Sequence, residues 1–514
     1  MSLTHWSWFF LIVYVGAMLA IGVVARRRVR HADDFATARR SYGPIVLALA
    51  FAASIASGST FLGTSGLSYQ WGLPSLWGKF LYPIGVYFGV LISIRLIASA
   101  GNRFGSRTIP EYLGDRYQSD GIRILVSLFS LVLFFYLAGQ LVSGIVMFET
   151  MLGLDPEWAI VITTAVLLGY VVMGGAHADI LTDSVQGFLM LGVAITIIGL
   201  TIAGAGTDGG FPGLVRNLGE QDPELVQLLN DKTPLYHSWW AIVAVVFAHI
   251  PLGLLPHMGN KLWALKDNRQ QMTFVRFAFV VSLTMAMMGF AGLLARGVFG
   301  DMLLQEGLNP NQSLPLLLIE LMPTWLAALI GVGILSAIMS TADGLIVSSS
   351  QIVANDLYRR TVAPRIHSQL SEVELDRRVL AISRISTVVI LLLCMALGWA
   401  LLDYNITLIV WIGAGGLMAA FAGPLVVGAL WRGVTRAGAY AGLVGGMVTF
   451  TVLHAQLIDP SWFADGMSAN IATWIRNEGP NPFSCTALGQ FVSIATTVIC
   501  LLYTSDAADD YFWG

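Results

Sequence analysis

The chain has 514 residues, of which 56% are hydrophobic and 11% are charged, and its mean hydropathy is +0.72. This composition is typical of an integral membrane protein and argues against a water-soluble globular domain. The net charge of −3 indicates little, and Cys394, Cys485 and Cys500 form no pair motif that would predict a metal site or a disulfide framework.

A helix that spans a bilayer needs about 20 apolar residues, and about thirteen segments meet that length. They begin near Trp6, Ile45, Leu73, Ile122, Glu157, Asp183, Trp239, Phe274, Pro323, Val379, Ile406, Ala437 and Thr486. The first is not a cleavable signal peptide, because its basic residues follow the apolar stretch. We therefore expect an all-α integral membrane protein.

Basic residues gather in alternate loops, while the loops between them are acidic or nearly neutral. The basic loops hold, in order, Arg26, Arg27, Arg28, Arg30, Arg39 and Arg40, then Arg103, Arg107 and Arg116, then Lys261, Lys266 and Arg269, and later Arg359, Arg360, Arg365, Arg377, Arg378, Arg432 and Arg436. Positive loops face the cytoplasm, so the pattern predicts a multi-pass protein with its N-terminus outside.

The second and seventh segments are interrupted by residues that break helices. The second reads FAASIASGSTFLGTSG from Phe51, and the seventh reads AHIPLGLLPHMG from Ala248. Glycine and proline release backbone groups, which must find new partners inside a membrane. Broken helices in matching positions indicate an inverted repeat with a binding site at its midplane. The alternative is a pair of kinked packing helices.

This reading divides the chain into five parts. Residues 1–40 form an extra N-terminal helix and a basic loop, 41–205 the first repeat, 206–238 an extracytoplasmic loop, 239–430 the second repeat, and 431–514 peripheral C-terminal helices. We expect the chain to be truncated within the last part, because the closing TSDAADDYFWG resembles foreign sequence rather than a native tail.

The ninth segment, Ile334 to Leu357, carries a polar face. At 100° per residue, six small or polar side chains fall within roughly 100° of arc: Ser340, Thr341, Gly344, Ser348, Gln351 and Asn355. Single hydroxyls in hydrocarbon usually bond to a helix backbone. A continuous stripe more often lines a pathway or an ion site, and we interpret it so here.

Several motifs in this order resemble the sodium:solute symporter family, which has the leucine-transporter-like fold. They are the ASGS break of the second segment, TIPEYLGDRY from Thr108, the GG…TD…Q pattern from Gly174 to Gln186, and SAIMSTADGL…NDLY from Ser336. The resemblance covers about Ser41 to Arg436. It implies a 5+5 inverted-repeat core whose first and sixth core helices are discontinuous.

The resemblance also implies a sodium site between the second and ninth segments. Its ligands fall on the carbonyls of Ala53, Ala56 and Ala337 and on the hydroxyls of Ser340 and Thr341. Sodium is a hard cation that prefers oxygen, and a broken helix supplies free carbonyls.

Two acids belong to a possible second ion site or exit path, Asp183 and Asp343. Relatives with a second ion tend to have hydroxyls at positions 343 and 344, so this chain departs from them. Asp343 either adds a charged ligand or forms a structural pair. Ile55 stands where proline-transporting relatives carry an aspartate, which argues against that branch.

Solute is expected beside the two breaks. The candidates are Ser57, Ser59, Thr60, Tyr136, Gln140, His249 and Trp263, each of which is otherwise a packing residue. Lys79 is a further candidate, since a lysine at membrane depth is costly and usually has a partner. It either pairs with a solute carboxylate or snorkels to the outer surface.

The sequence thus predicts a sodium-coupled symporter of the bacterial inner membrane that imports a small organic anion by alternating access. The alternatives are a proton-coupled carrier of the same fold, using Asp183, Asp343 or His249, and a sugar or amino-acid substrate. An enzyme is not expected, because no nucleophile–base pair appears. The partners would be solute, sodium and lipid, with no nucleic acid, and the protein would be a monomer or a weak oligomer.

Overall fold

The computed structural model describes residues 1–27, 36–367, 369–463 and 466–503, and within these ranges the chain is helical with no β-strand. Arg28, Arg30 and the tail from Thr504 lie outside the described residues. Ten helices are long and apolar enough to cross a membrane: Leu3–Arg26, Leu73–Ile94, Asp120–Leu152, Gly175–Ala203, Arg269–Phe299, Thr324–Ile366, Glu372–Ala400, Ile406–Leu430, Arg436–His454 and Pro482–Cys500.

Two further spans are broken, at the places where the sequence predicts it. Pro44–Ile55 and Ser59–Trp71 meet at 58°, and Trp239–Leu254 and Pro256–Trp263 meet at 54°. Counting each pair as one span gives up to 12 membrane-spanning helices in the described chain. The predicted span near Glu157 is a shorter apolar helix, Pro156–Leu168, so the number thirteen stays a prediction.

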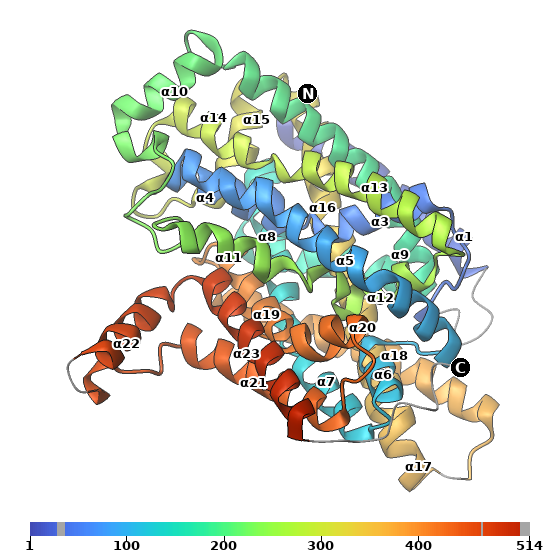
Figure 1. Ribbon diagram of the computed structural model, residues 1–514. Helices are drawn as coiled ribbons and strands as arrows, with labels where there is room; N and C mark the ends of the chain where they lie inside the picture. Colours follow the sequence, from blue (N-terminus) through green and yellow to red (C-terminus); the bar gives the residue numbers. More distant parts are fainter. Residues whose placement is uncertain (28–35, 368, 464–465, 504–514) are drawn as a thin grey trace.

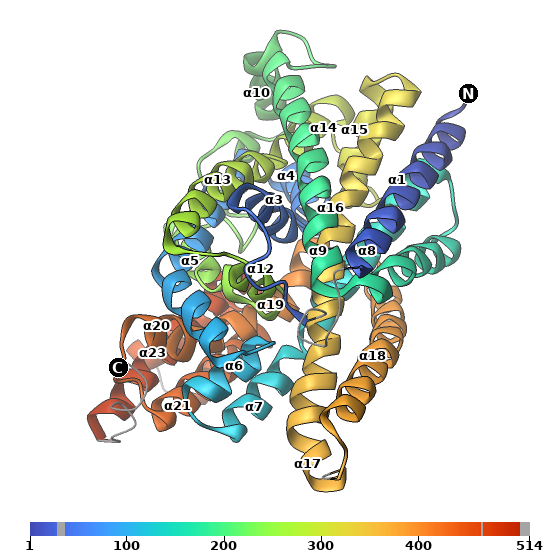
Figure 2. The ribbon, with the colours of Figure 1, turned by 90° about the vertical axis from the view of Figure 1, so that its right-hand side faces the viewer.

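Three helices form the centre of the molecule: α3 (Pro44–Ile55), α9 (Pro156–Ala203) and α16 (Thr324–Gln351). α16 packs against α9 and α3, and α1 (Leu3–Arg26) covers α9 and α16 from outside (Figure 2). α9 changes direction at Gly175, whose φ of 53° and ψ of −145° a residue with a side chain rarely adopts. This bend separates the short apolar helix from the span that carries Asp183.

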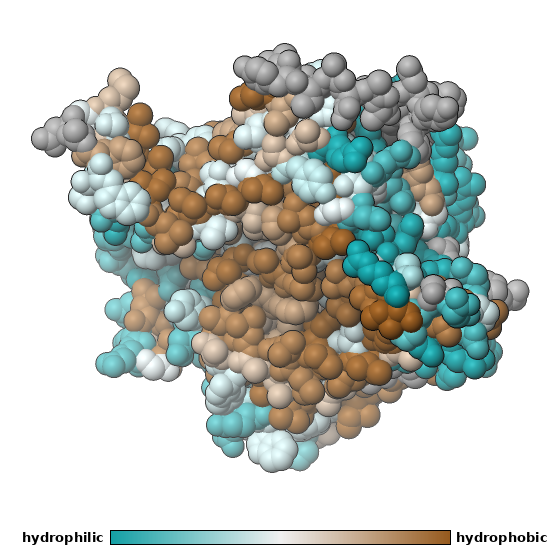
Figure 3. Space-filling model, turned by 90° about the horizontal axis from the view of Figure 1, so that it is seen from below, coloured by the Kyte–Doolittle hydropathy of each residue, from teal (hydrophilic) through white to brown (hydrophobic). Residues whose placement is uncertain are grey.

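The remaining helices surround this centre. α19 (Ile406–Phe421), α21 (Arg436–His454) and α23 (Pro482–Tyr503) pack on one another as a group at one side (Figure 1). α13 (Asn268–Ala286) packs against α3, and α5 (Leu76–Phe104) packs against α13. Apolar residues cover the middle of the face shown in Figure 3, with polar residues toward its margins, as a lipid-facing belt requires.

Close helix contact after the first break depends on a glycine. Gly292 of α14 (Gly289–Phe299) faces α4 (Thr64–Trp71), and a Cβ added there would lie 2.8 Å from the amide nitrogen of Tyr69. Membrane helices approach this closely only where small residues stand at the interface.

We expect Gly292→Ala to lower stability by about 1–3 kcal/mol, because the two backbones must separate. Thermal unfolding of the detergent-purified protein measures this. Gly192→Ala is the matched control, since Gly192 is exposed and no atom lies within 4 Å of its added Cβ. An equal melting temperature for both variants would contradict the packing argument.

Candidate functional site

The break after α3 redirects three backbone amides. Ser57 N donates to Ile55 O at 3.0 Å, Gly58 N donates to the side-chain Oε1 of Gln140 at 3.0 Å, and Thr60 N donates to Ser57 O at 2.9 Å. In a continuous helix each amide would bond to the carbonyl four residues earlier. The carbonyls released in this way belong to Ala53, Ser54 and Ala56.

Two hydroxyls of α16 meet the released carbonyls. Ser340 Oγ donates to Ala53 O at 3.0 Å, and Thr341 Oγ1 donates to Ser54 O at 3.1 Å. Both hydroxyls also lie near Ala337 O of their own helix, at 3.3 and 3.5 Å. All five groups are buried from solvent. The structure therefore brings four of the five predicted sodium ligands into one cluster.

Ala56 is the predicted ligand that does not join this cluster. It caps the end of α3, where its amide donates to Ala52 O, and in the described chain neither hydroxyl of the pair bonds to its carbonyl. The carbonyl of Ser54 takes its place, because Gln140 holds the amide of Gly58 that would otherwise bond to it. The sequence shows the break but not which side chain captures that amide.

The donor set of the cluster suits sodium. Its oxygens are neutral carbonyls and hydroxyls, held between one broken helix and one continuous helix. Oxygen ligands of this kind bind a small hard cation without the strong attachment that several carboxylates would give. Such a site can release its ion on the far side of a membrane.

Beside the cluster lies a buried group of charges that we call the acid–lysine cluster: Asp179, Asp183 and Lys261. Lys261 Nζ lies 2.7 Å from Asp179 Oδ2 and 3.1 Å from Asp183 Oδ2, and its side chain is 0% exposed. Asp183 Oδ2 also accepts a hydrogen bond from Ser54 Oγ at 2.7 Å.

Lys261 corrects an expectation from the sequence. The positive-loop pattern predicts it in a cytoplasmic loop, whereas it lies in the buried helix α12 (Gly259–Trp263) that follows the second break. The two aspartates explain this, because paired carboxylates compensate a buried ammonium. Asp343 is also buried, at 2% exposure, and its part in an ion path stays a prediction.

A small cavity of about 50 Å³ lies beside the first break. Six of the eight predicted solute residues line it: Ser57, Ser59, Thr60, Lys79, Tyr136 and His249. The sequence did not single out its other walls, which include Tyr82, Tyr236, Thr407, Trp411 and Phe483. These residues come from distant segments, so only the fold could have shown them.

Lys79 lies inside the protein and does not snorkel to the outer surface. Its side chain is buried, and Nζ donates to Thr64 Oγ1 at 2.9 Å. No acidic residue lines the cavity among the described residues, and none of them forms an ion pair with Lys79. The cavity is therefore lined by an amine whose partner is a hydroxyl and not a carboxylate.

Two predicted solute residues lie elsewhere. Gln140 Oε1 is used to hold the amide of Gly58, as described above. Trp263 Nε1 donates to Ile97 O at 3.2 Å, and its ring packs near the guanidinium of Arg39. Both lie outside the cavity lining, and their part in solute binding stays a prediction.

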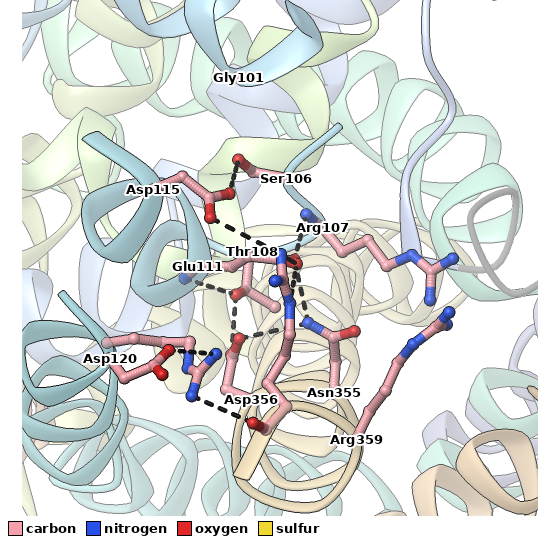
Figure 4. A network of polar contacts seen from close by, with 12 residues as sticks. Gly101, Ser106, Arg107, Thr108, Glu111, Asp115, Asp120, Asn355, Asp356 and Arg359 are labelled. Carbon is pink, nitrogen blue, oxygen red and sulfur yellow. Dashed lines mark hydrogen bonds and ion pairs between the residues drawn. The ribbon is translucent and has the colours of Figure 1, made fainter. Parts of the chain in front are cut away.

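A second polar network joins the far end of the polar helix to a short helix (Figure 4). α16 continues into a π-helix, η8 (Ile352–Val362), whose Arg360 and Asn355 donate to Glu111 of α6 (Ile109–Arg116) at 2.8 and 3.0 Å. Thr108 Oγ1 donates to Asp356 Oδ2 at 2.7 Å. Burial and the nearby Glu111 carboxylate raise the pKa of Asp115. The network anchors the helix that carries Ser340 and Thr341.

Broken helices that offer carbonyls to a hydroxyl pair, next to a solute cavity, define an ion-coupled membrane transporter. The model of the sodium:solute symporter family matches residues 35–446. The chain therefore belongs to this family, as its motifs predict, and is a sodium-coupled symporter rather than an enzyme.

Characterised relatives agree with this assignment. The chain is 28% identical over 459 residues to the sodium/pantothenate symporter of Escherichia coli, covering 86% of this chain and 89% of that protein. It is also 28% identical to the sodium/proline symporter of Salmonella typhimurium, with 86% of each chain covered. A solved Na⁺-coupled sialic acid symporter, in a substrate-bound outward-open state, matches with a TM-score of 0.74 at 18% identity over 98% of this chain and 99% of that one.

We expect the double variant Ser340→Ala and Thr341→Val to lower the apparent sodium affinity at least about tenfold, which corresponds to about 1.4 kcal/mol. The reason is that it removes both hydroxyl oxygens while keeping the side-chain volume. Sodium-dependent thermal stabilisation of the purified protein measures the affinity.

The matched control is Ser348→Ala on the same helix, because Ser348 Oγ bonds only within its own helix, to Leu345 O at 3.1 Å. An unchanged sodium affinity in the double variant would show that sodium binds elsewhere.

Proposed function

We propose that this symporter imports a small organic anion of the monocarboxylate kind together with sodium, by alternating access. The observation that carries the proposal is Lys79, a buried ammonium that faces the cavity with a hydroxyl as its partner. A charge left in this state is costly in a membrane protein. A solute carboxylate would compensate it, which gives the anion a specific place to bind.

The other walls of the cavity support a solute with an apolar body and a few polar groups. Tyr82, Trp411 and Phe483 offer aromatic surface, while Ser57 and Thr60 offer hydroxyls. At about 50 Å³ the cavity is smaller than typical small-molecule sites, so a solute would need the walls to move apart as alternating access opens the site. A solute of this shape would set its carboxylate against Lys79 and its remaining polar groups against the broken helix.

The broken helix also supports coupling between the two sites. Ser57 lines the cavity, while the carbonyls of Ala53 and Ser54, a few residues earlier, meet the hydroxyls of α16. Sodium that binds these carbonyls would order the same stretch of backbone that contacts solute. A coupling free energy of about 1.4 kcal/mol would raise solute affinity about tenfold.

The two relatives described above are symporters of pantothenate and of proline. Pantothenate carries a carboxylate and no ammonium group, so it suits a cavity with one positive charge. An amino acid would also need a partner for its own ammonium, and no carboxylate of the described residues lines the cavity. Amino-acid and sugar substrates, and proton coupling, therefore remain the alternatives to be tested.

The proposed setting is the bacterial inner membrane. The N-terminus would lie outside, the repeats would span residues 41–205 and 239–430, and the protein would act as a monomer or a weak oligomer. Lys79 and Tyr136 of the cavity would then face a solute that enters from the extracytoplasmic side.

In proteoliposomes, we expect an inward sodium gradient to drive uptake of a radiolabelled monocarboxylate such as pantothenate. The concentration gradient of sodium supplies the free energy for accumulation of the solute. Proline and glucose serve as comparison solutes. Equal uptake with and without sodium would refute sodium coupling, and uptake stimulated by acid alone would favour the proton-coupled alternative.

We expect Lys79→Met to raise the KM for the monocarboxylate about 30-fold or more, since truncating one partner of a buried charge pair typically costs 2–5 kcal/mol. Lys79→Arg should retain part of the affinity because it keeps the charge. Lys266→Met, at an exposed position, is the control. A KM that Lys79→Met leaves unchanged would place the solute away from this lysine.

A further inference from the structure

We propose that Lys261 is a built-in cation that occupies the place of a second sodium ion, so that the protein carries one sodium per solute. The inference rests on the proposed function, because it concerns the ion count of sodium-coupled uptake. Three observations support it: the position of the acid–lysine cluster, the pairing of one ammonium with both carboxylates, and the burial of all three side chains.

The cluster lies directly against the candidate sodium site. Ser54 links the two, because its carbonyl accepts from Thr341 Oγ1 at 3.1 Å while its hydroxyl donates to Asp183 Oδ2 at 2.7 Å. Gly344, three residues after Thr341 on α16, faces the same cluster: a Cβ added to it would lie 3.4 Å from Asp179 Oδ1. Ser54 thus contacts both the hydroxyl pair of α16 and the acid–lysine cluster.

Two carboxylates this close together would attract a cation. Here the ammonium of Lys261 fills that role, at 2.7 and 3.1 Å from one oxygen of each acid. A sodium ion bound to the same carboxylates would stand against this ammonium, and two like charges at such a distance in a buried site repel strongly. The lysine therefore offsets one of the two negative charges, and its own charge repels a second ion at the same carboxylates.

The origin of the ammonium also matters. Lys261 belongs to α12, which follows the second break, whereas Ser54 ends the first helix before the first break and Asp183 lies on α9. A lysine side chain is covalently attached to the protein, so it stays beside the acids, whereas a bound sodium ion would leave during each transport cycle. It holds the second broken helix to α9 but adds no transported charge.

The inference has a consequence for energetics. One sodium and one monocarboxylate together carry no net charge, so their uptake would not respond to the membrane potential. A second sodium would make the cycle carry one positive charge inward, and each 100 mV would then raise the accumulation ratio about 50-fold. The ion count therefore decides whether the voltage across the membrane drives uptake.

The experiment counts sodium in two ways, with purified wild-type protein and with Lys261→Met. Equilibrium binding of radioactive sodium, without solute, gives the ions bound per protein. Proteoliposomes loaded with potassium and treated with valinomycin give the effect of an inside-negative potential on monocarboxylate uptake. We expect the wild type to bind one sodium ion per protein, and its rate of monocarboxylate uptake to be the same with and without the membrane potential.

We expect Lys261→Met to bind two sodium ions and to respond to the potential, since the acids are then free to hold an ion. Asp183 Oδ1, which accepts no hydrogen bond in the described chain, would supply a further ligand. Lys261→Arg keeps the charge and should keep one sodium. The triple variant Asp179→Asn, Asp183→Asn and Lys261→Met removes all three charges and should also bind one.

Two sodium ions in the wild type, or a folded Lys261→Met that still binds one, would overturn the inference. If Lys261→Met does not fold, Lys261→Gln carries the same expectation, and the wild-type count decides by itself. Failure of the proposed function gives a different result, namely no sodium binding or no sodium-driven monocarboxylate uptake in the wild type.

Discussion

The hydrogen bonds between the hydroxyls of α16 and the carbonyls released at the end of α3 are the contact on which the rest of the site depends. A membrane interior offers no water to a released carbonyl, so each one must find a partner from the protein or from an ion. Ser340 and Thr341 are such partners when they donate, and in the proposed sodium site their oxygens would become ligands. The break is therefore the place where unpaired backbone oxygens and the proposed ion site coincide.

Two lysines, Lys79 and Lys261, are buried in the protein, and their surroundings differ. Lys261 lies against two aspartates, whereas Lys79 has a hydroxyl partner in a cavity without acids among the described residues. Because a buried charge is costly unless it is compensated, the two lysines suggest opposite roles. Lys261 is paired within the fold, and Lys79 is the group that the proposed organic anion would pair with.

The continuous helix formed by α16 and η8 contacts its neighbours through different groups near its middle and at its far end. Near its middle, neutral oxygens contact α3, and at its far end Arg360, Asn355 and Asp356 of η8 bond to α6 (Figure 4). The contacts at the end of the helix include an ion pair, whereas those near the middle join neutral groups. Because α16 continues directly into η8, a movement that separates α6 from η8 would reach Ser340 and Thr341 through one continuous helical segment.

The sequence alone determined the membrane class, both broken helices and the polar face of α16, because apolar length, glycine and proline, and the 100° period act locally along the chain. It also indicated the family, through motifs whose order is linear. Only the tertiary structure decided that Ser54 rather than Ala56 meets Thr341, that Trp263 packs on α5, and that Lys261 is buried with Asp179 and Asp183. Each of these contacts joins groups that are far apart in the sequence. Their distance in space depends on how the helices pack, which no local sequence pattern encodes.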